Sequence, residues 1–235
     1  MESYYAKQLE CLCSQVRPGD REAMEASKRH WNKIAKPLDG LGRMEDLLVK
    51  IAGVVRSEKL CLERKAVVVF CADNGVVAEG VTQTGSEVTA VVTENIARGI
   101  ASVNRMASVA GADVIPIDVG VKGRLQETGI RNCRIADGTA NLLHEPAMTM
   151  EQTLEAIHTG IALAGELKDS GYDLLAVGEM GIGNTTTSSA IASVMLEQPP
   201  EAVTGRGAGL SGEGLERKIP VSYTHLRAHE TELHL

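Results

Sequence analysis

Short apolar runs alternate with helical segments along the middle of the chain, and this alternation constrains the fold more than any other feature. KAVVVFC at 65–71 is a continuous apolar run of the kind found in strands that are buried on both faces. The runs at 113–119 and 173–177 have the same character, and 134–136 is a shorter candidate strand. Strands separated by helices join into parallel sheets through right-handed crossovers. We therefore expect an α/β fold with a parallel sheet flanked by helices.

Between and before these runs, apolar residues recur with the spacing of helices along most of the chain. Asp20 is placed to cap one helix, and Thr149 with Gln152 forms a capping-box pattern at the start of another. The helices before residue 60 are expected to form a small unit of their own. The expected helices span 2–14, 20–34, 44–55, 87–98, 101–110, 149–168 and 188–196.

The composition excludes several classes of protein. Aromatic residues make up only 3% of the chain and hydrophobic residues 43%, so a core of Val, Ala, Ile and Leu is expected, which favours layered α/β packing. A net charge of -7 argues against a nucleic-acid partner. Five cysteines without C-x-x-C spacing fit reduced thiols, and we expect a cytoplasmic protein. With no apolar run of about 18 residues, we expect neither export nor membrane insertion.

The sequence GEMGIGNTTT at 178–187 carries the strongest chemical signal, because it lies between a strand-like run and a helical run. Gly181 and Gly183 allow the backbone to approach a ligand, and the helix that follows presents unpaired N–H groups to an anion. Glu179 would repel a phosphate, so its presence suggests a partner such as a sugar hydroxyl or a developing positive charge. This combination points to a ribose phosphate. The alternative is a tight strand-to-helix turn without a ligand.

For three other charged residues, the sequence leaves both a functional and a structural role open. Lys218 follows the glycine-rich stretch 204–210 at the end of a short helical run, and it either neutralises an anion or is a solvated helix end. Asp73 and Glu79 lie in the loop at 72–86, where each either acts on a ligand or serves the loop itself.

The last fifteen residues differ in character from the rest. VSYTHLRAHETELHL at 221–235 has no Gly and holds three of the six histidines. A metal site formed by His225, His229 and His234 is disfavoured, because four- and five-residue spacings on a terminal segment are weak evidence for ligation. We expect no metal site. The expected domains are a helical segment at 1–60, an incomplete Rossmann-like nucleotide-binding domain at 61–220 and a foreign tail at 221–235.

Five motifs occur in order and together resemble one enzyme family, that of nicotinate-nucleotide:dimethylbenzimidazole phosphoribosyltransferase. The resemblance covers residues 5–219. The motifs are KPLDGLGRMEDL at 36–47, CADNGVVAEGV at 71–81, GTANLLHEPAMT at 138–149, GEMGIGNTTT at 178–187, and GRGAGL at 205–210 with the later Lys218.

This resemblance implies a cytoplasmic homodimeric enzyme with a Rossmann-like sheet domain and a small helical domain. It implies transfer of 5-phosphoribose from nicotinate mononucleotide to 5,6-dimethylbenzimidazole in cobalamin biosynthesis, giving alpha-ribazole 5'-phosphate and nicotinate without a metal or cofactor. Glu179 would stabilise positive charge on the ribose, Lys218 would neutralise the phosphate, and Thr84 would line the benzimidazole pocket. The residues that would bind the nucleotide are Gly181, Gly183, Asn184, Thr185, Thr186, Gly205 and Gly207.

The chain departs from the family pattern at its C-terminal side. The resemblance implies that a later segment supplies a glutamate acting as general base on the benzimidazole N–H, and this chain carries no such segment. We therefore expect an exposed strand edge, uncovered apolar surface, weak binding of nicotinate mononucleotide and little turnover. The alternative is a non-catalytic protein that binds a nucleotide or phosphate with the same glycine loops.

Overall fold

The computed structural model describes residues 4–232, and for residues 223–232 it describes the backbone alone. The chain divides into two compact units between Glu63 and Arg64. The first unit is helical, and the second holds the sheet and all the glycine-rich motifs that follow the first strand.

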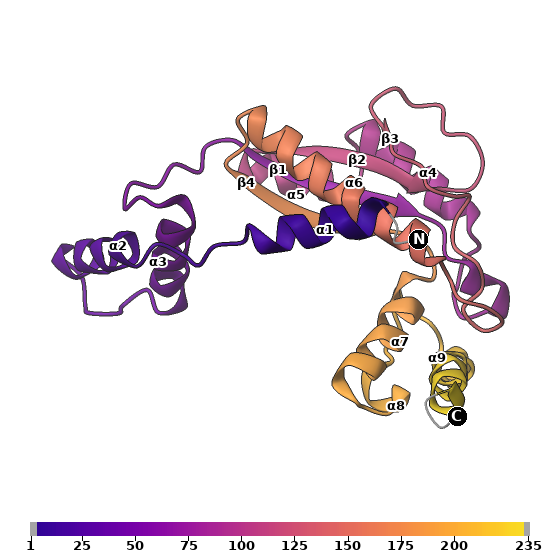
Figure 1. Cartoon of the computed structure of the whole chain (residues 1–235). Helices are drawn as coiled ribbons and strands as arrows, with labels where there is room; N and C mark the ends of the chain where they lie inside the picture. Colours follow the sequence, from indigo (N-terminus) through magenta and orange to yellow (C-terminus); the bar gives the residue numbers. More distant parts are fainter. Residues whose placement is uncertain (1–3, 233–235) are drawn as a thin grey trace. The chain divides into compact units, whose positions relative to one another are not determined.

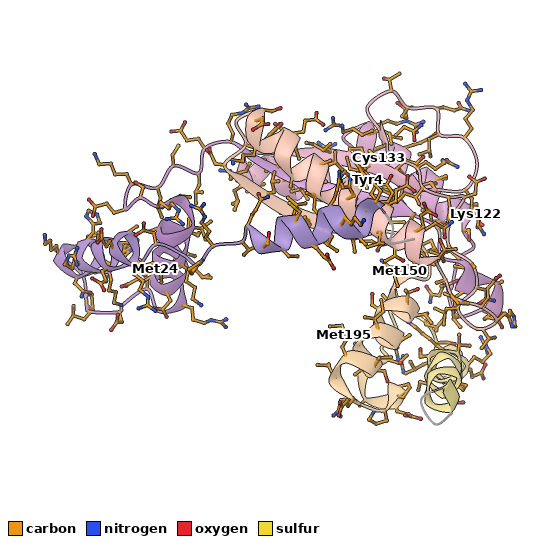
Figure 2. The ribbon with its side chains drawn as sticks, viewed as in Figure 1. Tyr4, Met24, Lys122, Cys133, Met150 and Met195 are labelled. Carbon is orange, nitrogen blue, oxygen red and sulfur yellow. The ribbon has the colours of Figure 1, made fainter. Side chains whose placement is uncertain are left out.

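The first unit contains α1 (Tyr4–Ser14), α2 (Arg21–Lys33) and α3 (Arg43–Val55). Asp20 caps α2 as predicted, because its Oδ1 accepts a hydrogen bond of 3.0 Å from Ala23 N. Met24, labelled in Figure 2, packs against Gly53 of α3 so closely that a Cβ at this glycine would lie 2.7 Å from the Met24 Cγ. The absence of a side chain at Gly53 thus sets how closely α2 and α3 approach.

The motif at 36–47 builds the connection between these two helices. Lys36 Nζ lies 2.7 Å from Glu45 Oε1, which also accepts a hydrogen bond of 3.0 Å from Leu41 N. Glu45 is only 1% exposed. The lysine and the backbone hydrogen bond together lower the pKa of Glu45. The motif is therefore a turn held by an internal ion pair.

The second unit is built on a four-stranded parallel sheet in the order β3-β2-β1-β4, which confirms the predicted α/β class. Its strands are β1 (Lys65–Ala72), β2 (Ala112–Gly120), β3 (Arg131–Asn132) and β4 (Leu174–Met180).

The expected strand at 134–136 is wrong, since β3 ends two residues earlier. Asn132 Oδ1 accepts a hydrogen bond of 3.1 Å from Arg134 N, which turns the chain out of the ladder. Arg134 then pairs with Asp118 at 3.1 Å. Two backbone bonds to β2, from Cys133 and Ile135, persist beyond the strand without making it regular.

Helices cover both faces of the sheet (Figure 1), and alternate residues of β1 face each side. Val68 packs with Leu163 and Leu167 of α6 (Met150–Asp169) on one face. Val69 packs with Ile96 of α4 (Glu87–Ala97) on the other, where α5 (Ser102–Ala110) also lies. A strand that is apolar on both sides is thereby buried on both sides, as its sequence predicts.

The predicted capping box of α6 is confirmed. Thr149 Oγ1 accepts a hydrogen bond of 3.2 Å from Gln152 N, and the Gln152 side chain accepts one of 2.9 Å from Thr149 N. These two reciprocal bonds satisfy backbone donors at the start of the helix and fix where it begins.

β4 is longer than the sequence predicts, and the turn after it is correspondingly shorter. Its ladder with β1 continues through Glu179 to Met180, which pairs with Cys71. α7 (Asn184–Leu196) then begins at Asn184, so the expected helix start at Ser188 is wrong. Only the three residues 181–183 separate strand from helix.

The predicted short helix ending at Arg217 and Lys218 is also wrong. After α8 (Pro200–Val203), α9 (Gly212–Glu232) runs through Pro220 and crosses the predicted boundary at 221. Ser222 is fully buried, and Val221 packs against the cluster formed by Val76, Val81 and Leu142. Packing of this helix outweighs the cost of one proline in its interior.

Apolar side chains are exposed along β4 and α7. β4 forms one edge of the sheet, as expected, and Val177 in its middle is 78% exposed. On α7 the exposed side chains are Ile191, Val194, Met195 and Leu196, of which Met195 is labelled in Figure 2.

Candidate functional site

The candidate site lies where β1 and β4 end at the same edge of the sheet. β2 lies on one side of β1 and β4 on the other, so the chain reverses its direction of travel across the sheet at β1. Ligands of open parallel sheets bind at such points, beyond the carboxyl ends of the strands. The loop after β1 contains the 3-10 helix η1 (Gly75–Glu79), and the turn after β4 is the three-residue segment 181–183.

Two glycines in this turn are required by its geometry. A Cβ at Gly181 would overlap the Ala72 carbonyl oxygen and would lie 2.8 Å from Asn74 Nδ2. Gly183 has φ of +91°, in the left-handed region that side chains disfavour, and it precedes the first residue of α7. The turn therefore brings backbone close to the end of β1, which fits the structural alternative of a tight strand-to-helix turn.

Asn74 at the end of β1 holds the turn and α7 in place. Its Nδ2 donates a hydrogen bond of 3.3 Å to Ile182 O, and its Oδ1 accepts one of 3.0 Å from Thr187 Oγ1. Ile182 N donates in turn to Thr89 Oγ1 of α4 at 3.1 Å. None of these contacts is visible from sequence spacing, because they join residues about a hundred positions apart.

Glu179 lies at the end of β4 and accepts a hydrogen bond from Asn184 Nδ2 in the first turn of α7. Although part of the side chain is exposed, burial of the carboxylate raises the pKa of Glu179, and the Asn184 bond partly opposes this. A carboxylate at this position is stabilised when positive charge develops beside it.

Lys218 of α9 is a second charged group at this edge, and it is only 1% exposed. Its Nζ donates hydrogen bonds of 2.8 Å to Thr185 Oγ1 and 3.0 Å to the Gly205 carbonyl. No carboxylate within the described residues pairs with it, and burial lowers the pKa of Lys218. A buried cation whose neighbours are neutral is suited to receive an anion, and the alternative of a solvated helix end is excluded.

These elements line a cavity of about 130 Å³, the glycine pocket. It contains six of the ten predicted site residues, since Thr84, Gly181, Gly183, Asn184, Thr185 and Lys218 all line it. Seven residues that were not predicted as site residues complete the lining: Val81, Thr82, Gln83, Ile182, Arg206, Ala208 and Leu210.

The other predicted site residues lie close by but outside the lining. Thr186 is fully buried behind it, with a hydroxyl that has no hydrogen-bond partner among the described residues. Gly205 contributes its carbonyl to Lys218. Gly207 has φ of +58°, and a Cβ there would lie 2.7 Å from Thr185 Oγ1. Both glycines therefore bring the 205–210 loop against Lys218 and the start of α7.

Glu179 lines a neighbouring cavity of about 400 Å³ between β4 and the α4–α5 face of the sheet. Val67, Val69 and Ile96 supply apolar walls to this cavity. Asn184 lines the glycine pocket and binds Glu179, so the carboxylate lies next to both cavities.

Asp73 and Glu79 do not line either cavity. Asp73 is buried, and its Oδ2 accepts a hydrogen bond of 2.7 Å from Lys122 N, which supports the structural reading of this residue. Glu79 accepts a hydrogen bond of 2.6 Å from Asn141 and lies 3.3 Å from His144 Nε2. Glu79 thus joins η1 to the 138–149 motif, a contact that neither reading of the sequence anticipated.

Among residues 4–222, whose side chains the structure describes, no group of three His, Cys, Asp or Glu side chains is arranged to hold a metal ion. The side chains of His225, His229 and His234 lie outside the described part of the chain. Within the part of the chain that the structure describes, no helix combines the length and the apolar character needed to cross a membrane.

Comparisons with known proteins agree in pointing to one family. A family model described as Phosphoribosyltransferase (DBI_PRT) matches residues 16–234. The nicotinate-nucleotide--dimethylbenzimidazole phosphoribosyltransferase of Acetivibrio thermocellus is 43% identical over 201 residues, which are 86% of this chain and 57% of that protein. The protein of the same name from Chloroflexus aurantiacus is 42% identical over 223 residues, covering 94% of this chain and 64% of the relative.

A solved structure gives the same result. The crystal structure of nicotinate-nucleotide-dimethylbenzimidazole phosphoribosyltransferase from Thermus thermophilus superposes with a TM-score of 0.81 at 39% identity. The superposition covers 88% of this chain and 62% of the solved chain. The chain therefore spans about three fifths of the length of the relatives it matches.

Proposed function

Because the chain belongs to the phosphoribosyltransferase family DBI_PRT, we propose that its glycine pocket binds the phosphoribose of nicotinate mononucleotide for transfer to 5,6-dimethylbenzimidazole. The family match and the named relatives confirm the family resemblance that five ordered motifs predicted. The products of the proposed reaction are alpha-ribazole 5'-phosphate and nicotinate, as in cobalamin biosynthesis.

The observation that carries this proposal is the pairing of two charged groups through adjacent residues of α7. Asn184 binds Glu179, and its neighbour Thr185 binds Lys218. A buried cation and a carboxylate are therefore both tied to the first turn of α7. A phosphate needs positive charge, and a ribose that loses its base needs negative charge at its anomeric carbon. A ribose phosphate therefore needs a positively charged group beside its phosphate and a negatively charged group beside its anomeric carbon.

The proposed chemistry follows from these positions. The bond between the anomeric carbon and the pyridinium nitrogen breaks, and its electron pair neutralises the nitrogen, so nicotinate leaves without an acid. Positive charge then develops on the ribose, where the Glu179 carboxylate stabilises it. A ring nitrogen of dimethylbenzimidazole forms the new bond to the anomeric carbon, and the N–H proton of that ring passes to water. Lys218 and the α7 amides hold the phosphate throughout.

We further propose that the protein works as a cytoplasmic homodimer. This proposal rests on the family resemblance, and the reduced state of the five cysteines is consistent with it. Light scattering coupled to size-exclusion chromatography measures the oligomeric state directly. A mass of two chains supports the dimer, and a mass of one chain contradicts it.

Two measurements on the purified chain test the function. Calorimetric titration with nicotinate mononucleotide tests the pocket, and incubation with both substrates followed by detection of alpha-ribazole 5'-phosphate tests the transfer. Product forming faster than in the Glu179→Gln variant supports the proposed reaction. Binding with equal product formation in both proteins supports the non-catalytic nucleotide-binding alternative. An absence of binding contradicts the proposal.

A further inference from the structure

The glycine pocket holds two positively charged side chains and no carboxylate among its lining residues. Lys218 is one of them, and Arg206 from the 205–210 loop is the other. A single phosphate is already served by Lys218 and by the amides at the start of α7. The second cation is available to a second anionic group on the same ligand.

The two cations are held differently. Lys218 is buried and fixed by its bonds to Thr185 and Gly205. The backbone of Arg206 is anchored, because its carbonyl accepts hydrogen bonds of 3.0 Å from Leu210 N and 3.4 Å from Gly209 N. Its side chain is exposed, and the guanidinium has no hydrogen bond or ion pair with any part of the chain that the structure describes. Arg206 is thus positioned at the pocket with its donors free.

The chemistry of the two side chains assigns them to different anions. The ammonium of a lysine acts as a point charge and suits a phosphate that is also bound by backbone amides. The planar fork of an arginine matches a carboxylate through two parallel hydrogen bonds. Nicotinate mononucleotide, the donor in the proposed function on which this inference rests, carries a phosphate at one end and a pyridine carboxylate at the other.

We propose that Arg206 binds the pyridine carboxylate and is the residue that makes the pocket select nicotinate mononucleotide over nicotinamide mononucleotide. The amide of the nicotinamide compound has no negative charge, so it forms no ion pair with the guanidinium. It also turns N–H donors toward a group that only donates. Discrimination then comes from one end of the ligand, while phosphate binding by Lys218 is common to both compounds.

Three ligands separate the contribution of each end. Nicotinate mononucleotide carries both anionic groups, nicotinamide mononucleotide carries the phosphate only, and ribose 5-phosphate lacks the ring altogether. Calorimetric titrations of the wild-type chain with each ligand are expected to show tighter binding of the nicotinate compound by about tenfold or more, the scale of a charge-assisted hydrogen bond.

The Arg206→Gln variant tests the residue itself. Its affinity for nicotinate mononucleotide is expected to fall to that for nicotinamide mononucleotide, while its affinities for the other two ligands stay at the wild-type values. Arg206→Lys is expected to recover part of the preference, because it restores charge without the fork. Arg217→Gln is the matched control, since Arg217 is an exposed arginine next to Lys218 that does not line the pocket.

The possible failures are distinguishable. Equal weakening of all three ligands in Arg206→Gln would show that Arg206 binds phosphate, and it would overturn the assignment while leaving the proposed function intact. An unchanged preference in that variant would overturn the assignment as well. Failure of the wild-type chain to bind any of the three ligands would overturn the proposed function and the assignment together.

Discussion

Lys218 Nζ donates a hydrogen bond of 2.8 Å to Thr185 Oγ1, which fastens a buried cation of α9 to the first turn of α7. The residue before Thr185 is Asn184, which donates to Glu179. Two adjacent residues therefore connect Glu179 to Lys218. Any change at the start of α7 is expected to affect both phosphate binding and charge stabilisation at the ribose.

Replacing Lys218 by methionine removes the charge and keeps most of the side-chain volume. Affinity for ribose 5-phosphate is expected to fall about tenfold to a hundredfold, the scale of a lost charge-assisted hydrogen bond. Thermal stability is expected to stay the same or rise, because the buried ammonium is poorly solvated in the free protein. Calorimetry and thermal unfolding measure the two effects. Arg217→Met, an exposed change of the same charge, is expected to alter neither.

The lowered pKa of Lys218 has a consequence for pH dependence. Burial holds the pKa of Lys218 below its ordinary value of 10.5. At pH values between the lowered pKa and 10.5, Lys218 is therefore protonated in the unfolded chain and neutral in the folded chain. Stability of the free protein is expected to rise as pH increases through this window. Affinity for ribose 5-phosphate is expected to fall over the same window, as Lys218 loses its charge. Denaturant titrations and calorimetry across this pH range measure both.

The Lys218→Met variant supplies the reference for this experiment. Other groups that titrate in the alkaline range change stability in both proteins, so the contribution of Lys218 is the difference between them. A pH profile that is the same in both proteins would show that the lysine has an ordinary pKa, and it would count against a buried cation in the pocket.

Replacing Glu179 by glutamine keeps an acceptor for Asn184 and removes the negative charge. In a full-length homologue that carries this site, the rate of phosphoribosyl transfer is expected to fall roughly a hundredfold to a thousandfold, the scale of one lost stabilising group in a transition state. Binding of nicotinate mononucleotide is expected to change little, because the positive charge on the ribose develops only during the reaction. A rate equal to that of the unmodified chain would exclude the charge-stabilising role.

The same variant tests the raised pKa of Glu179. Because the pKa of Glu179 is higher in the folded protein than its ordinary value of 4.5, the free energy of unfolding falls as pH rises from 4.5 through the raised pKa. Glu179→Gln is expected to abolish this loss and to be the more stable protein at neutral pH. Thermal unfolding at a series of pH values compares the two profiles, and equal profiles would contradict the assigned burial.

Gly181→Ala and Gly205→Ala form a matched pair at the site. A Cβ at Gly181 would overlap the Ala72 carbonyl and crowd Asn74, so a loss of about 1–3 kcal/mol in unfolding free energy is expected. Nothing lies within 4 Å of a Cβ at Gly205, and its φ is not in the left-handed region. That variant is expected to be neutral or slightly stabilising. Chemical denaturation measures both, and equal stability of the two variants would contradict the close turn.

Much of this fold could be predicted from local sequence. The buried runs of β1 and β2 and the capping residues Asp20 and Thr149 depend on neighbouring residues only, and the structure has them where the patterns place them. The end of β4 could not be predicted, because Gly178 weakens a strand locally. Its pairing with Val69 of β1 keeps it in the ladder, and that is a contact between distant parts of the chain.

The site could be predicted in part for the same reason. Residues that follow parallel strands meet at one edge of the sheet, so the turn at 181–183 and the loop after β1 had to lie together. The contacts of Asn74 with Ile182 and Thr187 depend on tertiary structure. The position of Arg206 could not be predicted either, since a glycine-rich loop does not fix the direction of its side chains.

The most direct test of the account is a crystal structure of this chain with nicotinate mononucleotide bound. We expect the phosphate within hydrogen-bond distance of Lys218 Nζ, the anomeric carbon facing the Glu179 carboxylate, and the ligand against the turn at 181–183. A ligand bound elsewhere, or a phosphate that makes no contact with Lys218, would contradict it.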